Sequence, residues 1–153
     1  MKYYKIKSYA KINFSLNVLK KLKNKFHKIE SLISIINLHD IIYIKKNKKK
    51  KHHIEFIGRF SKGIKRNNTI SILFKLLDKR KLLNGNKYLI KIKKNIPQKS
   101  GLGGGSMNAA NILNFFIKKK FININKKKVK NISNLIGSDV ILGIIPVSTI
   151  LTS

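Results

Sequence analysis

The sequence predicts one domain of the α+β class, and three observations lead to this prediction. Its 153 residues are enough for a single domain with a buried core. Some segments alternate apolar and polar residues, which predicts strands, and others place apolar residues three and four positions apart, which predicts helices. A glycine-rich stretch, residues 101–110, joins a predicted strand to a predicted helix.

The first part of the chain is predicted to be mostly strands. Residues 2–19 alternate in two stretches and predict two strands. Residues 32–44 contain two apolar segments on either side of Leu38-His39-Asp40, which predicts two strands joined by a turn. The charged run at residues 45–53 is typical of an exposed hairpin tip. Residues 54–57 then predict a short strand.

Helical periodicity dominates the second part. Apolar residues at helical spacing predict a helix that begins at Asn67-Asn68-Thr69 and runs to about Leu83, with the Thr69 hydroxyl as a candidate N-terminal cap. Residues 87–96 alternate and predict the central strand. A second helix is predicted at residues 109–119, and a basic third helix at residues 126–136.

The net charge of +30 is compatible with a nucleic-acid-binding module, but the composition favours another origin. The chain has 32 Lys, 27 Ile and 17 Asn, and all three amino acids have A/T-rich codons. Nucleotide bias explains all three excesses, whereas RNA binding would explain only lysine. Arginine, which is better suited to recognising phosphate and guanine, occurs three times. We therefore expect no specific nucleic-acid partner, and only generic affinity for polyanions.

Other features of the sequence indicate the cellular compartment. The chain has no cysteine, so it has neither a disulfide nor a thiolate metal site, which is typical of a reducing cytosol. Residues 1–7 lack the apolar core of a signal peptide. The longest nearly apolar run, residues 140–151, is too short to span a bilayer. We expect a cytoplasmic protein without a membrane partner.

The glycine-rich stretch is the strongest functional signal. Four of the nine glycines lie between Gly101 and Gly105. Glycine reaches positive φ and lets a ligand approach the backbone, and the free N–H groups at a helix N-terminus attract an anion. Ser106 is a candidate helix cap and a candidate Mg²⁺ ligand. A flexible turn is the alternative, but the strand before and the helix after favour a phosphate-binding loop. No Gly-Lys-Ser/Thr follows, so it is not a Walker loop, and the acidic residue of the dinucleotide fingerprint is missing.

Residues 97–110, PQKSGLGGGSMNAA, resemble the ATP loop of the GHMP kinases. The resemblance implies an α+β fold similar to the second domain of ribosomal protein S5, with ATP and Mg²⁺ as cofactors. It implies that ATP is held by Pro97, Gln98, Lys99, Ser100, Gly101, Leu102, Gly103, Gly104, Gly105, Ser106 and Met107. Lys99 and Ser100 depart from the family, which has small residues at both positions.

Two further motifs resemble the catalytic segments of the same family. Residues 9–13, Tyr-Ala-Lys-Ile-Asn, are similar to its opening Pro-Ala-Lys-(Ile/Leu)-Asn, and residues 137–140 to its Gly-(Ala/Ser)-Asp-Val. The resemblance implies that Asp139 is the catalytic base and that Lys11 stabilises charge beside the acceptor hydroxyl. Without it, Lys11 would be a surface lysine and Asp139 a turn residue. Ile141 stands where the family has proline.

The substrate is implied by residues 26–32, which resemble a segment of one branch of the family. That branch phosphorylates the 2-hydroxyl of a cytidine diphosphate-linked methylerythritol in isoprenoid precursor biosynthesis. Phe26 and His27 would embrace the cytosine by stacking and hydrogen bonding, and Asn13 would help to hold the substrate. The family's preceding Asp-Gly is replaced by Asn24-Lys25. A core phenylalanine and a surface histidine are the alternative.

The resemblance covers nearly all of residues 1–153, but only the N-terminal half of the family. We therefore expect residues 1–153 to form the ATP-binding domain, with the C-terminal GHMP domain absent. Three alternatives remain open: another small-molecule kinase of the family, a truncated non-catalytic fragment, and an RNA-binding module of the ribosomal type. The oligomeric state has no signal in the sequence.

Overall fold

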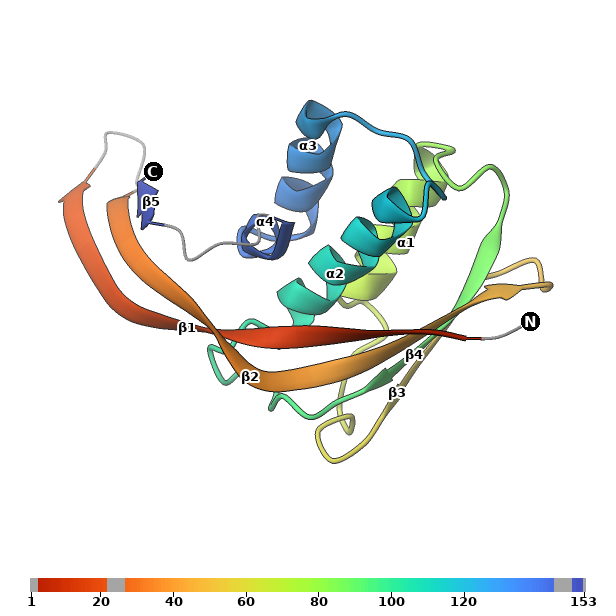
Figure 1. The fold of residues 1–153 in the computed structure, drawn as a ribbon, viewed down its shortest axis with the longest axis horizontal. Helices are drawn as coiled ribbons and strands as arrows, with labels where there is room; N and C mark the ends of the chain where they lie inside the picture. Colours follow the sequence, from red (N-terminus) through yellow and green to blue (C-terminus); the bar gives the residue numbers. More distant parts are fainter. Residues whose placement is uncertain (1–2, 22–26, 145–149, 153) are drawn as a thin grey trace.

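The structure is a computed structural model that describes residues 3–21, 27–144 and 150–152. It consists of a strongly curved sheet with helices packed on one face (Figure 1). The strands are β1 (Tyr4–Lys21), β2 (His27–Asn47), β3 (His53–Ile57), β4 (Lys87–Lys93) and β5 (Ile150–Thr152). The helices are α1 (Thr69–Lys79), α2 (Gly104–Lys118), α3 (Lys126–Ile136) and α4 (Val140–Ile144). The predicted α+β class is confirmed.

The sheet has the strand order β1-β2-β4-β3, and β5 pairs with β2 outside this order. The pairs β1–β2, β2–β4 and β2–β5 are antiparallel, whereas β3 and β4 are parallel and are connected through α1. The loop between β4 and α2 therefore begins at an inner strand and ends at a helix packed on the sheet.

The two strands predicted in residues 2–19 are one strand, β1, and the turn predicted at Leu38-His39-Asp40 is wrong. Tyr9 pairs with His39 and Ala10 with Ile36, so β2 carries two extra residues at this point. Such an irregularity bends and twists an antiparallel pair without reversing the chain. The alternation in the sequence was right, but a bulge interrupts it in the same way as a turn does.

The hairpin predicted around residues 45–53 is also wrong. β2 and β3 follow each other in the sequence but do not pair, because β4 lies between them. The parallel β3–α1–β4 unit returns the chain to the sheet between the two strands. A charged connection looks the same in the sequence whether it joins neighbouring strands or skips one.

Both ends of α1 differ from the predicted ones. α1 is capped by the Asn68 side chain, which accepts from the N–H groups of Ile70 and Ser71 at 3.0 and 3.1 Å, so the prediction of Thr69 as the cap is wrong. α1 ends at Lys79 rather than Leu83, because Lys81 takes a left-handed conformation, with φ of 55°. α3 matches its predicted bounds.

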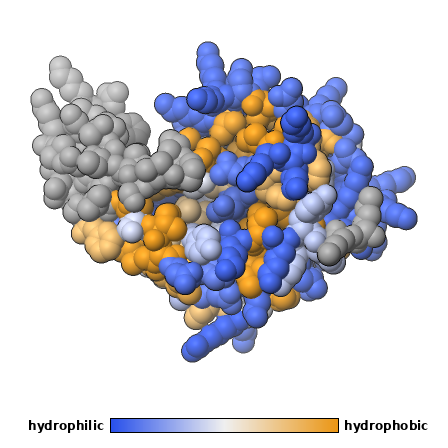
Figure 2. Space-filling view, in the orientation of Figure 1, coloured by the Kyte–Doolittle hydropathy of each residue, from blue (hydrophilic) through white to orange (hydrophobic). Residues whose placement is uncertain are grey.

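The core lies between the sheet and the helices. Its fully buried members include Ile42 and Ile44 on β2, Ile90 and Ile92 on β4, and the apolar faces of α1 and α2. Figure 2 shows hydrophilic side chains projecting around the outline of the described part, with hydrophobic side chains between them. Among the described residues, no helix is both long and apolar enough to cross a bilayer.

Candidate active site

A pocket of about 440 Å³ lies against the glycine-rich loop. The loop and the first turn of α2 form one wall, contributing Pro97, Gln98, Lys99, Ser100, Gly101, Gly103, Gly104, Gly105, Ser106 and Asn108. The remaining lining comes from Phe56, Ile64, Asn68, Thr69, Ile70, Lys94 and Asp139. The pocket thus combines backbone amides and polar side chains on one side with apolar side chains from β3, α1 and the segment between them.

Two glycines of the loop, Gly103 and Gly104, are required by close packing. Gly103 is the N-cap of α2 and has φ of 69°, so no side chain shields the N–H groups of the first turn. A Cβ at Gly103 would lie 3.0 Å from Cγ of Lys11, and a Cβ at Gly104 would lie 3.0 Å from Cγ2 of Ile96. The result is a cradle of exposed backbone at a helix N-terminus, which is suited to an anion.

Helix α2 begins at Gly104, five residues before the start at Ala109 that the sequence predicted. Glycine is a poor helix former, so its presence argued against helix. Ser106 consequently lies inside the first turn, and the prediction that it caps the helix is wrong. It still lines the pocket.

The structure brings together the two predicted catalytic residues. Lys11 Nζ lies 3.4 Å from Oδ2 of Asp139, and it also donates to Oδ1 of Asn13 at 3.0 Å. The backbone N–H of Lys11 donates to the carbonyl of Leu102 at 3.1 Å, which ties β1 to the glycine-rich loop. The three side chains and the loop therefore form one continuous site.

Asp139 is held at the pocket by the short helix that follows it. A Cβ at Gly143 in α4 would lie only 2.6 Å from Cβ of Ala110 in α2, so the two helices touch at backbone distance. The Asn114 side chain donates to the carbonyl of Gly143 at 2.9 Å. Because Asp139 immediately precedes α4, this close contact fixes where its carboxylate lies.

The structure does not place four other predicted site residues at the pocket. Leu102 and Met107 do not line the pocket, and Met107 is buried beneath the loop, with Cγ 3.5 Å from the position of a Cβ at Gly103. Phe26 lies outside the described residues. His27 opens β2 opposite Lys21, and only its backbone is described.

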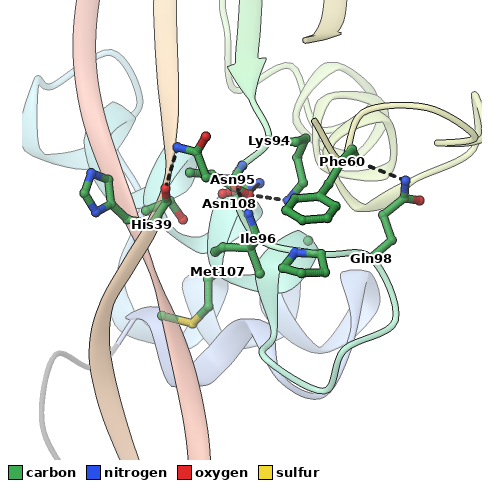
Figure 3. A network of polar contacts seen from close by, with 12 residues as sticks. His39, Phe60, Lys94, Asn95, Ile96, Gln98, Met107 and Asn108 are labelled. Carbon is green, nitrogen blue, oxygen red and sulfur yellow. Dashed lines mark hydrogen bonds and ion pairs between the residues drawn. The ribbon is translucent and has the colours of Figure 1, made fainter. Parts of the chain in front are cut away.

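Sequence reasoning missed a buried polar group next to the loop. Asp40 on β2 accepts from Lys94, from Asn108 and from the backbone N–H groups of Asn95 and Ile96. These four partners are labelled in Figure 3. Lys94 and Asn108 line the pocket. Nothing distinguishes Lys94 among 32 lysines in the sequence, whereas Asp40 could have been noticed as one of five acidic residues.

The described residues contain no group of three or more His, Asp or Glu side chains that could hold a metal ion by itself. A magnesium ion bound to phosphate oxygens needs only one or two protein oxygens. Ser106 and Asp139, both in the pocket lining, supply such oxygens, and the Gly103–Gly105 cradle leaves room for phosphates. The residues present therefore fit Mg²⁺ bound together with a nucleotide.

The fold and this site define a class of small-molecule kinases. The sequence model of the GHMP kinases N terminal domain matches residues 68–146, just over half of the chain. The chain belongs to the GHMP kinase family. It is 63% identical over 153 residues to the 4-diphosphocytidyl-2-C-methyl-D-erythritol kinase of Pelagibacter ubique (strain HTCC1062), covering 100% of this chain and 54% of that protein.

A second relative is the enzyme of the same name from Finegoldia magna (strain ATCC 29328 / DSM 20472 / WAL 2508). It is 33% identical over 135 residues, which is 88% of this chain and 48% of that protein. The chain thus spans about half the length of the curated relatives it matches.

Solved structures agree on the fold. A crystal structure of 4-(cytidine 5'-diphospho)-2C-methyl-D-erythritol kinase superposes with a TM-score of 0.72 at 21% identity, over 92% of this chain and 48% of that one. A crystal structure of mevalonate kinase gives a TM-score of 0.63 at 14% identity, again over 92% and 48%.

Proposed function

We propose that the chain is the ATP-binding half of a kinase that phosphorylates the 2-hydroxyl of 4-diphosphocytidyl-2-C-methyl-D-erythritol. The observation that carries the proposal is the Lys11–Asp139 contact of 3.4 Å beside the glycine cradle. The 63% identity to the Pelagibacter kinase supports this substrate. The reaction would belong to isoprenoid precursor biosynthesis in the cytoplasm.

ATP is the phosphoryl donor in this proposal. The phosphates would bind to the N–H groups of the loop and of the first turn of α2. These groups are free to bind them because the N-cap residue, Gly103, has no side chain that could accept their hydrogen bonds. The adenine base of ATP would pack on the apolar surface of Phe56, Ile64 and Ile70. Lys99 lines the pocket and has a left-handed backbone conformation, with φ of 56°. Its ammonium would add positive charge at the loop.

Asp139 and Lys11 divide the chemistry. The Asp139 side chain is 44% exposed, so a substrate hydroxyl can reach its carboxylate and give up a proton. The Lys11 side chain is 6% exposed and has two oxygen partners, so its ammonium is held in place to stabilise the developing alkoxide. Bound Mg²⁺ would neutralise charge on the transferring phosphoryl group, with Ser106 as a ligand.

The substrate would approach from the side of β1 that carries Lys11. Asn13 accepts a hydrogen bond from Lys11, and its amide group remains able to donate to the substrate. Phe26 and His27 are proposed to bind the cytosine, on the evidence of their motif alone.

The test is an assay of phosphoryl transfer from ATP to three acceptors: 4-diphosphocytidyl-2-C-methyl-D-erythritol, mevalonate and homoserine. It is run with the 153-residue chain alone and with the C-terminal half of the Pelagibacter relative added. We expect transfer to the first acceptor, and only weak transfer without the added half, because Lys11 and Asp139 would then act close to bulk water.

Two outcomes would contradict the proposal. A preference for mevalonate or homoserine would assign the chain to another kinase of the family. Absence of transfer to every acceptor in both preparations, with ATP bound, would identify a non-catalytic fragment. Strong turnover by the chain alone would show that the site closes without a second domain.

A further inference from the structure

A carboxylate without solvent exposure lies directly beneath the glycine-rich loop. Asp40 is 0% exposed, and its Oδ1 accepts from the backbone N–H groups of Asn95 at 2.7 Å and Ile96 at 2.8 Å. Its Oδ2 accepts from Lys94 Nζ and from Asn108 Nδ2, the latter at 2.8 Å. The proposed reaction gives Asp40 no role.

The partners of Asp40 lie on both sides of the loop. Asn95 and Ile96 follow the end of β4 and lead into the loop, whereas Asn108 lies in α2, which the loop enters (Figure 3). One side chain on β2 therefore holds the two ends of the loop together. Few other side chains could do this, because a carboxylate accepts several hydrogen bonds through two oxygens at once.

The loop between these ends is conformationally expensive. Lys99, Gly101 and Gly103 have φ of 56, 76 and 69°, and glycine loses more entropy on ordering than any other residue. Its end is also tightly packed, with Ile96 Cγ2 at 3.0 Å from the position of a Cβ at Gly104. A small movement of the end of β4 would therefore shift the first turn of α2.

The pocket wall carries a second sign that this network serves a ligand. Asn108 is 1% exposed, lines the pocket, and has an Oδ1 that is the one buried polar side-chain atom without a partner in the described part. The hydrogen bond to Asp40 fixes which end of the amide is the donor. Oδ1 is thereby kept as a buried acceptor on a residue that lines the pocket.

We propose that Asp40 is a positioning residue that holds the glycine-rich loop in its nucleotide-binding shape before the nucleotide arrives. The proposal rests on the proposed function, since it takes the pocket to be the ATP site. Asp40 acts through Asn95, Ile96, Asn108 and Lys94, and does not touch the nucleotide. A loop that is already ordered loses less entropy on binding, so the affinity is higher.

The direction in which one substitution changes the affinity for ADP separates this role from a purely electrostatic one. Asp40→Asn removes a negative charge from beneath an anion site, so charge alone would make ADP bind more tightly. It also presents an amide group to Lys94 and Asn108, both donors, and so loosens the loop. We expect ADP affinity to fall by about tenfold or more, measured by calorimetry.

The matched control is Glu55→Gln. It removes one carboxylate from the same sheet, where Glu55 pairs with Lys91 at 3.2 Å and both side chains are more than a third exposed. Neither residue lines the pocket, so we expect unchanged ADP affinity.

Hydrogen exchange supplies a readout that general destabilisation would not reproduce. In Asp40→Asn, the amides of Asn95, Ile96 and Met107 should exchange faster, whereas those of Ile90 and Ile92 inside β4 should keep their protection. If this variant does not fold, Asn108→Leu replaces it, because it leaves the Asp40–Lys94 pair intact and releases only the α2 end of the loop. It should show the same local loss.

The outcomes are distinguishable. Unchanged or tighter ADP binding in Asp40→Asn, with wild-type exchange in the loop, would overturn the positioning role and leave the proposed function intact. Uniformly faster exchange over the whole sheet in the Asn108→Leu protein would also overturn it. Failure of the wild-type chain to bind ADP would instead overturn the proposed function.

Discussion

Lys11 Nζ and Asp139 Oδ2 lie 3.4 Å apart, but the two side chains are 6% and 44% exposed. The ammonium is therefore fixed within the protein, while the carboxylate faces the pocket. This asymmetry suits a pair in which one member stabilises charge and the other exchanges a proton.

The first prediction concerns this pair. In an enzyme completed with its second half, Asp139→Asn should lower kcat by roughly 10²–10⁴-fold, because the base is lost while the shape is kept. Lys11→Met should lower kcat more than ATP affinity. Lys7→Met, an exposed lysine on the same strand, is the control and should have no effect. Steady-state kinetics with normal turnover in either site variant would remove that residue from the mechanism.

Gly103 and Gly101 provide a matched pair of substitutions in the loop. Both have positive φ, so alanine at either position should cost about 1–2 kcal/mol of unfolding free energy through strain. Only at Gly103 would the new Cβ press on Lys11, at 3.0 Å from its Cγ, whereas nothing lies within 4 Å of one at Gly101. Turnover, corrected for stability, should fall in Gly103→Ala alone. Equal losses in both variants would mean that Lys11 is not displaced.

Gly143 should control the catalytic carboxylate from a distance. Gly143→Ala creates a contact of 2.6 Å with Ala110 Cβ, which pushes α4 away from α2 and moves Asp139. Overpacking of this kind costs about 1–3 kcal/mol of stability, and kcat should fall as well. The double variant Gly143→Ala/Ala110→Gly removes the 2.6 Å contact and should recover kcat. Its stability should recover only in part, because glycine inside a helix costs about 1 kcal/mol and Met107 Sδ still lies 3.1 Å from the new Cβ. Recovery of stability without recovery of kcat would contradict the link to Asp139.

His52 should make the stability of the fold depend on pH. Burial lowers the pKa of His52 below 6.5, although its hydrogen bond to Asp78 opposes the shift. Its Nδ1 accepts from the Tyr88 N–H at 3.0 Å, so the folded state holds the neutral ring. The unfolded chain therefore binds the proton more readily, and the free energy of unfolding should fall as pH drops below 6.5.

The pKa of Asp78 is also lowered, because the hydrogen bonds from Lys87 and His52 outweigh the effect of burial, so a further loss should follow below 3.8. Urea denaturation over this range measures both effects. His52→Gln should flatten the upper part of the curve, while His53→Gln, at an exposed neighbour, should not. An unchanged curve in His52→Gln would place the titrating group elsewhere.

The charge of +30 should produce generic binding to polyanions. Affinity for duplex and single-stranded oligonucleotides should fall steeply with salt, without sequence preference, because counterion release drives the binding. Fluorescence titrations at several salt concentrations test this. An RNA that remains bound at physiological salt in a sequence-dependent way would favour the ribosomal-type alternative.

The sequence predicted most of the secondary structure but not how the strands and side chains come together in the fold. Alternation and helical spacing located parts of β1 to β4 and of α1 to α3, and α3 has the predicted bounds, whereas α4 and β5 were not predicted. The order of the strands could not be predicted, because β4 pairs with both β2 and β3 and alternation within a strand does not say which strands are neighbours. The start of α2 was missed because Gly104 and Gly105 are poor helix formers. The reason for glycine at these positions is the close approach of Ile96 and Thr69, which only the structure shows.

The site was predicted unevenly for a similar reason. Motifs that resemble a known family singled out Lys11 and Asp139 separately, and the structure places their charged groups 3.4 Å apart, while their roles stay a prediction. The Asp40–Lys94 pair carries no motif of its own. The pairing of Asp40 with Lys94 becomes recognisable only when the fold removes both side chains from water.

The contact between Ala110 and Gly143 has a consequence for how this gene can evolve. The chain has three alanines, and Ala10, Ala109 and Ala110 are all 0% exposed. A genome that drifts toward A/T replaces alanine and glycine with lysine, isoleucine or asparagine wherever the protein tolerates it. Under such drift, the three alanines that survive mark buried places where the packing leaves little room for a larger side chain.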